Sequence, residues 1–318
     1  MSKRNRRTPI HAVLRVFRHY RRAHGRAPLL FAPRRFTEKM QWRKLFDRDP
    51  LFAVMCDKLA CRDWIAERLG ADCLPPLLWS GDDAAAVPLE SLDTPYVVKC
   101  AHGSGMNLFV DDPRAVDAEA VRARIRDWQA QNPGVRTDEP GYVELKPRIL
   151  VEAMLAEADG APPVEYKFFL FDGRVELIMV RVNHDHDDHQ NLFTRADWSP
   201  VAVRFDAPAA EPFARPAELD RMLAIARRLG QGLDHVRVDL LVSRGRIYVG
   251  ELTPYSFSGM VCCEPDCFDA ELGRAWRIEA PLWRAVRALA GLASPRRRKA
   301  ALARSGRAGF DPAAEPAE

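Results

Sequence analysis

The chain has 318 residues, 47% of them hydrophobic, which is ordinary for a globular protein large enough to form two or three lobes. It has no apolar run near the roughly 20 residues of a membrane span, and its first residues lack the apolar core of a secretion signal. Its seven cysteines follow no framework spacing, so we expect free thiols in a reducing cytoplasm rather than disulfides or a zinc site.

The net charge of +4 conceals basic ends on an acidic body. Residues 1–48 hold 15 Lys and Arg and two acids, and residues 296–308 hold six Lys and Arg and no acid. The stretch 49–295 has 27 basic and 39 acidic residues. Basic ends suit an anionic membrane surface, an acidic partner or nucleic acid. Nucleic acid is not expected, because the basic stretches lack the interleaved aromatic residues of RNA-binding surfaces.

The first predicted element is a basic amphipathic helix over 9–24, with arginines on one side and, on the other, apolar residues at helical spacing: Ile10, Val13, Leu14 and Phe17. Two alternatives are open for this helix. It lies on the inner leaflet of an anionic membrane, or it packs on the body of the protein. Two further helices are expected over 36–50 and 51–70, the second ending at Gly70.

The middle of the chain alternates strands and helices without a regular βαβ series, which indicates an α+β fold. In chain order we expect a strand, glycine-rich loop and strand over 95–110, a helix over 113–132, a loop over 133–141, a buried strand over 147–155, a hairpin over 164–182 turning at Asp172-Gly173, and a helix over 214–232. The alternating His and Asp of 184–189 are more typical of a solvated loop than of a metal cluster. From 294 onward we expect a basic, disordered tail.

The most informative pair of residues is Asp239 and Glu251, on two β-branched, alternating segments joined by a short turn. A three-residue loop over 244–246 would place the two carboxylates opposite each other, about 5 Å apart on one face. A slip of one residue would separate them. Facing carboxylates repel unless a cation lies between them, and oxygen ligands at this spacing suit magnesium. The alternative is a pair of exposed acids on a sheet.

Other residues have two interpretations each. Lys99 precedes a loop with Gly103 and Gly105, which is either a phosphate-binding turn or an ordinary hairpin turn. Glu152 ends a buried strand, either capping the next helix or marking a hinge whose backbone contacts adenine. Lys167 either neutralises phosphate or pairs with Glu165, and its spacing favours the pairing.

Arg237 shares a face with Asp239, two residues away. Beside a magnesium–phosphate site it would stabilise a transferring phosphoryl group, whereas in a purely structural hairpin it would pair with Glu251. Arg181 lies on the return strand of the hairpin over 164–182. We expect acceptor-binding residues near Arg181 and the 184–198 loop, although no motif fixes them.

The order of these motifs resembles the TupA-like (teichuronopeptide biosynthesis) branch of the ATP-grasp superfamily. The resemblance extends over about 36–275 and rests on FTEKMQWRKLFDRDP, DKLACRDW, VVKCAHGSGMN, ILVEAML, YKFFLFDG, RVDLL and GELTPYSFSG. It implies two α+β subdomains that clamp ATP between antiparallel sheets, with a smaller N-terminal lobe. The implied division is an arm over 1–35, a lobe over 36–94, an ATP-lid subdomain over 95–155, a catalytic subdomain over 156–275 and a C-terminal helix and tail over 276–318.

The resemblance also implies roles for individual residues. Nucleotide contacts fall to Lys58, Lys99, the loop His102, Gly103, Ser104 and Gly105, and the backbone of Glu152 and Leu155. Arg237, Lys167 and Arg181 take the catalytic positions. Asp239 and Glu251 bind magnesium, and Thr253 stands where the family has an Asn ligand; it shares a face with Glu251.

The implied activity is a magnesium- and ATP-dependent carboxylate–amine ligase that works through an acylphosphate. The TupA-like branch suggests cell-surface polysaccharide or peptide-polymer synthesis, with a small amine as donor and a uronic-acid glycan as carboxylate acceptor. Its expected location is the cytoplasm, peripherally at the inner membrane face if the 9–24 helix contacts lipid. Two rivals are a kinase on the same scaffold that phosphorylates a sugar or lipid hydroxyl, and a non-enzymatic binding module with a degenerate ATP site.

Overall fold

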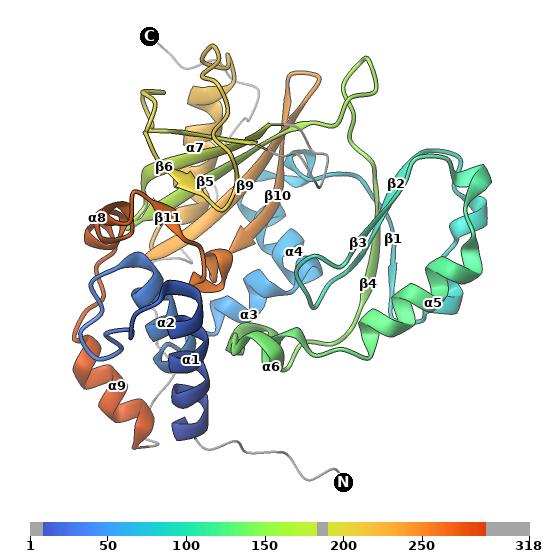
Figure 1. Cartoon of the computed structure of the whole chain (residues 1–318). Helices are drawn as coiled ribbons and strands as arrows, with labels where there is room; N and C mark the ends of the chain where they lie inside the picture. Colours follow the sequence, from blue (N-terminus) through green and yellow to red (C-terminus); the bar gives the residue numbers. More distant parts are fainter. Residues whose placement is uncertain (1–8, 183–189, 291–318) are drawn as a thin grey trace, which may run out of the picture.

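The computed structural model describes residues 9–182 and 190–290, and Figure 1 shows two separate antiparallel sheets with helices packed around them. The predicted α+β class is confirmed. All seven cysteines are free, as predicted. The predictions for the 184–189 loop and for the tail from 294 onward lie outside the described residues.

The smaller sheet has four strands in the order β1-β4-β2-β3, all antiparallel to their neighbours. These strands are β1 (Leu77–Gly81), β2 (Tyr96–Cys100), β3 (Asn107–Val110) and β4 (Ile149–Ala153). Helix α5 (Ala118–Gln129) packs on it through Val121, Ile125 and Trp128, which are buried with strand residues in one core. Strand β1 comes from the predicted N-terminal lobe, so this sheet crosses that predicted boundary.

The larger sheet has the order β10-β9-β5-β6-β7 and is also antiparallel. Its strands are β5 (Val164–Phe171), β6 (Arg174–Val182), β7 (Gln190–Thr194), β9 (His235–Ser243) and β10 (Arg246–Thr253). The β5–β6 hairpin turns at Asp172-Gly173 as predicted, and both residues have the positive φ that a type I′ turn requires.

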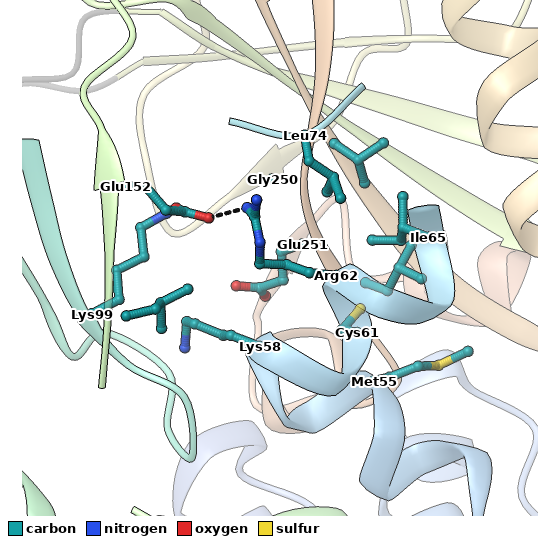
Figure 2. A pocket seen from close by; sticks show the side chains of 13 residues that line it. Met55, Lys58, Cys61, Arg62, Ile65, Leu74, Lys99, Glu152, Gly250 and Glu251 are labelled. Carbon is teal, nitrogen blue, oxygen red and sulfur yellow. Dashed lines mark hydrogen bonds and ion pairs between the residues drawn. The ribbon is translucent and has the colours of Figure 1, made fainter. Parts of the chain in front are cut away.

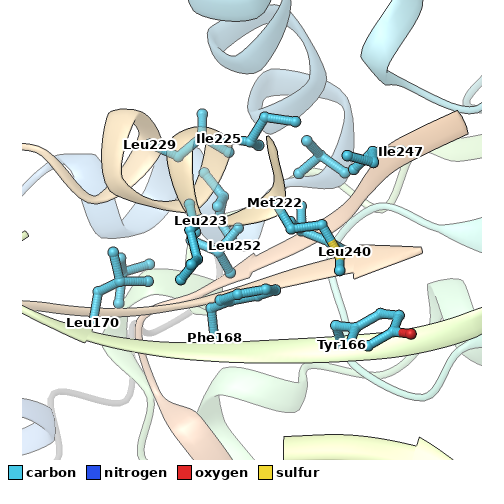
Figure 3. Packing of buried hydrophobic residues seen from close by; sticks show 14 of the residues in the cluster. Tyr166, Phe168, Leu170, Met222, Leu223, Ile225, Leu229, Leu240, Ile247 and Leu252 are labelled. Atoms are coloured by element: carbon cyan, nitrogen blue, oxygen red, sulfur yellow. The ribbon is translucent and has the colours of Figure 1, made fainter. Parts of the chain in front are cut away.

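Each face of the larger sheet is covered by helices. Helix α7 (Leu219–Gly230) packs Met222 and Leu223 on one face, over Phe168 and Leu240 (Figure 3). The other face buries Phe169 and Phe171 against α2 (Phe36–Phe46), α3 (Leu51–Cys56) and α8 (Cys267–Ala275). Glu165 and Lys167 precede Phe169 and Phe171 at intervals of two along β5, so they face this second layer as well. A two-stranded sheet of β8 (Arg204–Phe205) and β11 (Cys263–Glu264) completes the fold.

The helix predicted over 51–70 is two helices, which is a correction. Asp57 breaks it, because its carboxylate accepts hydrogen bonds from the backbone N–H groups of Leu59 and Ala60 and so starts a new helix, α4 (Lys58–Leu69). Gly70, with a φ of 89°, ends α4 as predicted. The segment expected as a loop over 133–141 contains a short helix, α6 (Pro133–Thr137), followed by a 3₁₀ turn.

Helix α1 (Pro9–His24) forms as predicted and packs beside α2 and α9 (Pro281–Leu289), as Figure 1 shows. Its Val16 and Tyr20 are buried, so one face of the helix packs on the body. Leu14 is exposed. No helix within the described ranges is long and apolar enough to cross a membrane.

Candidate active site

Asp239 and Glu251 face each other, but not through the predicted loop. Ser243 pairs with Arg246, so the loop has only two residues, Arg244 and Gly245, both with positive φ. Continued without interruption, that register would place Gly250 opposite Asp239. A β-bulge between Val249 and Glu251 shifts the pairing by one residue and returns Glu251 to the position opposite Asp239. The three-residue loop was therefore wrong, and the facing carboxylates are present.

Arg237 lies between the two carboxylates. Its Nε donates to Asp239 Oδ1 at 2.6 Å and its Nη2 donates to Asp239 Oδ2 at 2.7 Å. The same Nη2 is 3.3 Å from Glu251 Oε1 and 3.1 Å from Thr253 Oγ1. The Thr253 hydroxyl in turn donates to Glu251. Arg237 is thus the cation that offsets the repulsion between the facing acids.

Lys167 joins the same cluster from β5. Its Nζ is 2.7 Å from Asp239 Oδ2 and 2.5 Å from Glu165 Oε1, so the pairing with Glu165 is present and Asp239 is a second partner. Arg181, on β6 opposite Glu165, is 4.0 Å from that carboxylate. A row of alternating charges therefore runs across four neighbouring strands, from Arg181 to Glu251.

Asp239 and Arg237 in this row hold each other in their charged forms. Burial alone would raise the pKa of Asp239, but Arg237 and Lys167 outweigh it and hold that pKa below its usual range. Burial alone would likewise lower the pKa of Arg237, and the neighbouring Asp239 reverses this, so its pKa is raised. At neutral pH Asp239 and Arg237 are therefore both ionised.

A narrow cleft separates the two sheets and is lined by charges from both. Figure 2 shows Lys58 and Arg62 of α4, Lys99 of β2 and Glu152 of β4 around it, with the Glu251 side chain of β10 among them. Its cavity volume is about 30 Å³, room for only one or two water molecules. An apolar wall of the cleft is made by Met55, Cys61, Ile65, Leu74, Leu150, Val249 and Leu252.

The Glu152 side chain lies in this cleft and forms ion pairs with two of the cations that line it. Its Oε2 is 2.5 Å from Lys99 Nζ, and its Oε1 accepts from Arg62. The backbone of Glu152 lies inside β4, paired with Leu77 on β1 and Val97 on β2. A nucleotide entering the cleft must therefore separate the Glu152 side chain from its two cations. The expected adenine contacts of Glu152 and of Leu155, which follows β4, stay predictions.

Lys58 ties the start of α4 to the glycine-rich loop. Its backbone N–H donates to the Ala101 carbonyl at 3.0 Å, and its Nζ donates to the carbonyls of Cys100 and Gly103. Burial lowers the pKa of Lys58, Glu251 opposes that shift, and Lys99 adds to it. The two predicted nucleotide lysines thus lie close enough to influence each other.

The loop between β2 and β3 presents its backbone rather than its histidine. His102 is buried, and its Nε2 lies 3.1 Å from the Trp128 carbonyl of α5. Ser104 and Gly105 are exposed, and Gly105 has a φ of 71° that favours glycine. Only the backbone of this loop and Ser104 are therefore placed to cover a phosphate, and that role stays a prediction.

Two arginines of this region are not among the predicted site residues. Arg62 follows Lys58 by four residues on α4, so helical spacing on one face was the signal that pointed to it. Arg43 is fully buried and hydrogen-bonds the His235 and Pro254 carbonyls at 3.0 and 2.9 Å and Asp234 at 2.8 Å. It fixes the outer ends of β9 and β10, and these long-range contacts leave no local sequence signal.

The donor set suits magnesium better than a transition metal. No group of three or more His, Cys, Asp or Glu within the described residues is arranged to hold a metal ion. Asp239 and Glu251 offer two facing carboxylates, with the Thr253 hydroxyl beside them. Magnesium is usually held by one or two carboxylates and keeps several waters or phosphate oxygens. Arg237 and Lys167 occupy the oxygens of Asp239, so a metal there shares that carboxylate with them or displaces them.

Two antiparallel sheets that meet at a cleft, with Lys99 on one sheet and the facing acids Asp239 and Glu251 on the other, form the arrangement of an ATP-grasp enzyme. A family model described as TupA-like ATPgrasp matches residues 38–277, well over half of the chain. The chain belongs to the TupA-like ATP-grasp family. A comparison with curated proteins finds no match.

Among solved structures the chain has distant similarity to ATP-grasp ligases. The ligase PsnB complexed with a minimal precursor is 12% identical with a TM-score of 0.38, and the match covers 64% of this chain and only 54% of PsnB. The D-alanine–D-alanine ligase of Bacillus anthracis complexed with ATP is 14% identical with a TM-score of 0.41, covering 75% of this chain and 67% of the ligase. The family assignment rests on the family match, not on these similarities.

Proposed function

We propose that the protein is a magnesium- and ATP-dependent carboxylate–amine ligase that acts through an acylphosphate, in the synthesis of a cell-surface polysaccharide or peptide polymer. Membership of the TupA-like ATP-grasp family supports the proposal. The observation that carries it is the pairing of Asp239 with Glu251 beside Arg237 and Lys167, at the edge of a cleft lined by cations. Phosphoryl transfer needs this combination of metal ligands and fixed positive charge.

The proposed reaction has two steps. A carboxylate oxygen of the acceptor attacks the terminal phosphorus of ATP, ADP leaves, and an acylphosphate forms. The amine then attacks the acyl carbon, phosphate leaves, and an amide remains after loss of a proton. Asp239 and Glu251 would hold the magnesium ion, which supplies charge neutralisation on the phosphate oxygens.

The cations in the cleft have separate tasks in this scheme. Lys99 faces the cleft from β2 and Lys58 faces it from α4, and both would contact the nucleotide phosphates once Glu152 releases Lys99. Arg237 and Lys167 would stabilise the charge that develops on the transferred group. Burial within the larger sheet keeps both of these cations in fixed positions, which lowers the reorganisation needed during the reaction.

Trapping with hydroxylamine tests the proposal. An acylphosphate reacts with hydroxylamine to give a hydroxamate, so ADP release with a uronic-acid oligosaccharide and hydroxylamine should be accompanied by an equal amount of hydroxamate. A phosphorylated product without hydroxamate would instead establish the kinase. Absence of ATP binding would point to the non-enzymatic module. Asp239→Asn serves as the inactive control.

Peripheral membrane contact through residues 9–24 is part of the same proposal, with the protein placed at the cytoplasmic face of the inner membrane. The outward side of α1 carries exposed arginines, including Arg18 and Arg21, and exposed Leu14. On neighbouring α9, Leu282 and Trp283 are exposed as well. Exposed apolar and basic side chains on adjacent helices suit an anionic lipid surface.

A further inference from the structure

A second cavity, larger than the cleft, opens on the side of the molecule where α1, α2 and α6 meet the turn after β10. We call it the basic pocket. Its volume is about 560 Å³, within the range of small-molecule sites, whereas the cleft has about 30 Å³. It is lined by Val16, His19, Arg22, Ala23, Lys44, Arg136, Thr137, Asp138, Ser258 and Met260.

The basic pocket has surplus positive charge from separate segments. Its one acid, Asp138, is ion-paired with Arg15 of α1, whose Nε lies 3.3 Å from Asp138 Oδ2. Arg22 and Arg136 are exposed and form no ion pair with any residue that the structure describes. Arg136 lies near buried Glu139 and opposes the burial that raises the pKa of that carboxyl. Arg22 and Arg136 both line the pocket, so an anion bound there would gain attraction from two segments of the chain.

The floor of the pocket and the candidate active site share one turn, Phe257-Ser258. Lys44 is buried, and its Nζ donates to Ser258 Oγ at 2.9 Å. The preceding residue, Phe257, has its ring 5.2 Å from the guanidinium of Arg237. Phe257 and Ser258 have positive φ values of 51° and 55°, a conformation that costs about 1 kcal/mol or more for each non-glycine residue. In this strained turn Phe257 therefore contacts Arg237, and the next residue, Ser258, lines the basic pocket.

We infer that the basic pocket binds an acidic group of the glycan acceptor, a uronate carboxylate or a phosphodiester, while the carboxylate to be activated lies at Arg237. The inference rests on the proposed function and names its substrate class. The volume admits one or two sugar units, and Arg22 and Arg136 supply charge-assisted hydrogen bonds to the acidic group. A neutral glycan gains none of these contacts, so the pocket selects an anionic polymer.

Calorimetry with the full chain tests the inference, with three probes: a uronic-acid trisaccharide, a polyol-phosphate trimer and a neutral trisaccharide of the same size. We expect at least one acidic probe to bind and the neutral probe not to bind. Binding of the uronate alone or of the phosphate alone identifies the acidic group. In Arg22→Gln/Arg136→Gln we expect roughly tenfold weaker binding of the acidic probe and unchanged affinity for Mg-ATP.

Arg18→Gln/Arg21→Gln is the matched control, because it removes the same charge from exposed positions of α1 outside the pocket. It should bind the acidic probe like the wild type. Equal weakening in both double variants, or equal binding of the neutral probe, would overturn the inference. If the protein binds Mg-ATP but neither acidic probe, the inference is overturned and the ligase proposal stands. If the protein binds an acidic probe but does not bind Mg-ATP, the ligase proposal is overturned instead.

Discussion

Glu251 faces Asp239 because a β-bulge accommodates Gly250, an extra residue in β10. The two-residue turn at Arg244-Gly245 alone would place Gly250 opposite Asp239 and turn Glu251 to the other face of the sheet. The bulge brings both carboxylates and Arg237 to one face of the sheet. Val238 and Leu240 point to the opposite face, where they join the hydrophobic core. Bulges beside active sites commonly redirect a side chain in this way.

Insertion of one glycine between Gly250 and Glu251 should therefore turn Glu251 to the other face and weaken Mg-ATP binding by at least tenfold, measured by calorimetry on protein whose circular dichroism matches the wild type. Deletion of Gly250 removes the bulge but leaves Glu251 opposite Asp239, so binding should persist in that variant. Gly250→Ala is the matched control: a Cβ there would lie 3.5 Å from the Asp239 carbonyl oxygen, an ordinary contact, so binding should persist. Wild-type affinity in a folded insertion variant would show that the position of Glu251 does not matter.

Lys167→Met should lower the free energy of unfolding by about 2–3 kcal/mol, because Asp239 and Glu165 lose a shared buried cation. Arg237 remains on Asp239, which keeps the loss below that of a fully unpaired charge. Urea denaturation measures the change. In Lys167→Met/Asp239→Asn the loss should be smaller than the sum of the two single losses. Strict additivity would mean that the two side chains do not interact.

His235 should make the protein less stable in acid. Burial, together with Arg43, lowers the pKa of His235 to about 3, whereas the unfolded chain has a value near 6.5. Between these pH values His235 is protonated in the unfolded state and neutral in the folded state. The free energy of unfolding therefore falls as the pH drops from about 6.5 toward 3, by about 1.4 kcal/mol per pH unit. Denaturation at pH 7 and pH 5 measures it.

His235→Gln removes this titration, and its stability should change less between pH 7 and pH 5 than that of the wild type. The imidazole lies 2.9 Å from the Leu170 carbonyl and 3.1 Å from Ser256 Oγ, so the variant will be less stable at pH 7. The difference in slope is therefore the informative quantity. Identical slopes would assign the acid sensitivity to other groups.

Arg18→Gln/Arg21→Gln should reduce sedimentation with vesicles that contain anionic lipid, by roughly tenfold in the partition coefficient, and leave ATP turnover unchanged. This variant is a more specific test than a deletion of residues 1–30, because the deletion also removes Val16 and Tyr20, which are buried against the body. Neutral vesicles are the control. Equal sedimentation of wild type and variant would rule out membrane contact through this face of α1.

The sequence was most predictive where local patterns decide the structure. Alternation and turn residues predicted the hairpin at Asp172-Gly173, and the amphipathic pattern predicted α1. The helix break at Asp57 and the bulge at Gly250 were missed. A side-chain cap or one extra residue changes the local structure but leaves the hydrophobic periodicity of the sequence visible on both sides. Arg43 and the basic pocket depend on contacts between distant segments, which periodicity does not report.

Calorimetric titration of Mg-ATP into the wild type, Asp239→Asn and Glu251→Gln tests the central claim most directly. Glu176→Gln is the matched control, since Glu176 pairs with Arg174 at the surface of β6. We predict magnesium-dependent binding to wild type and Glu176→Gln, weakened at least tenfold in both site variants. Equal affinity in all four proteins, or binding that does not need magnesium, would contradict the account.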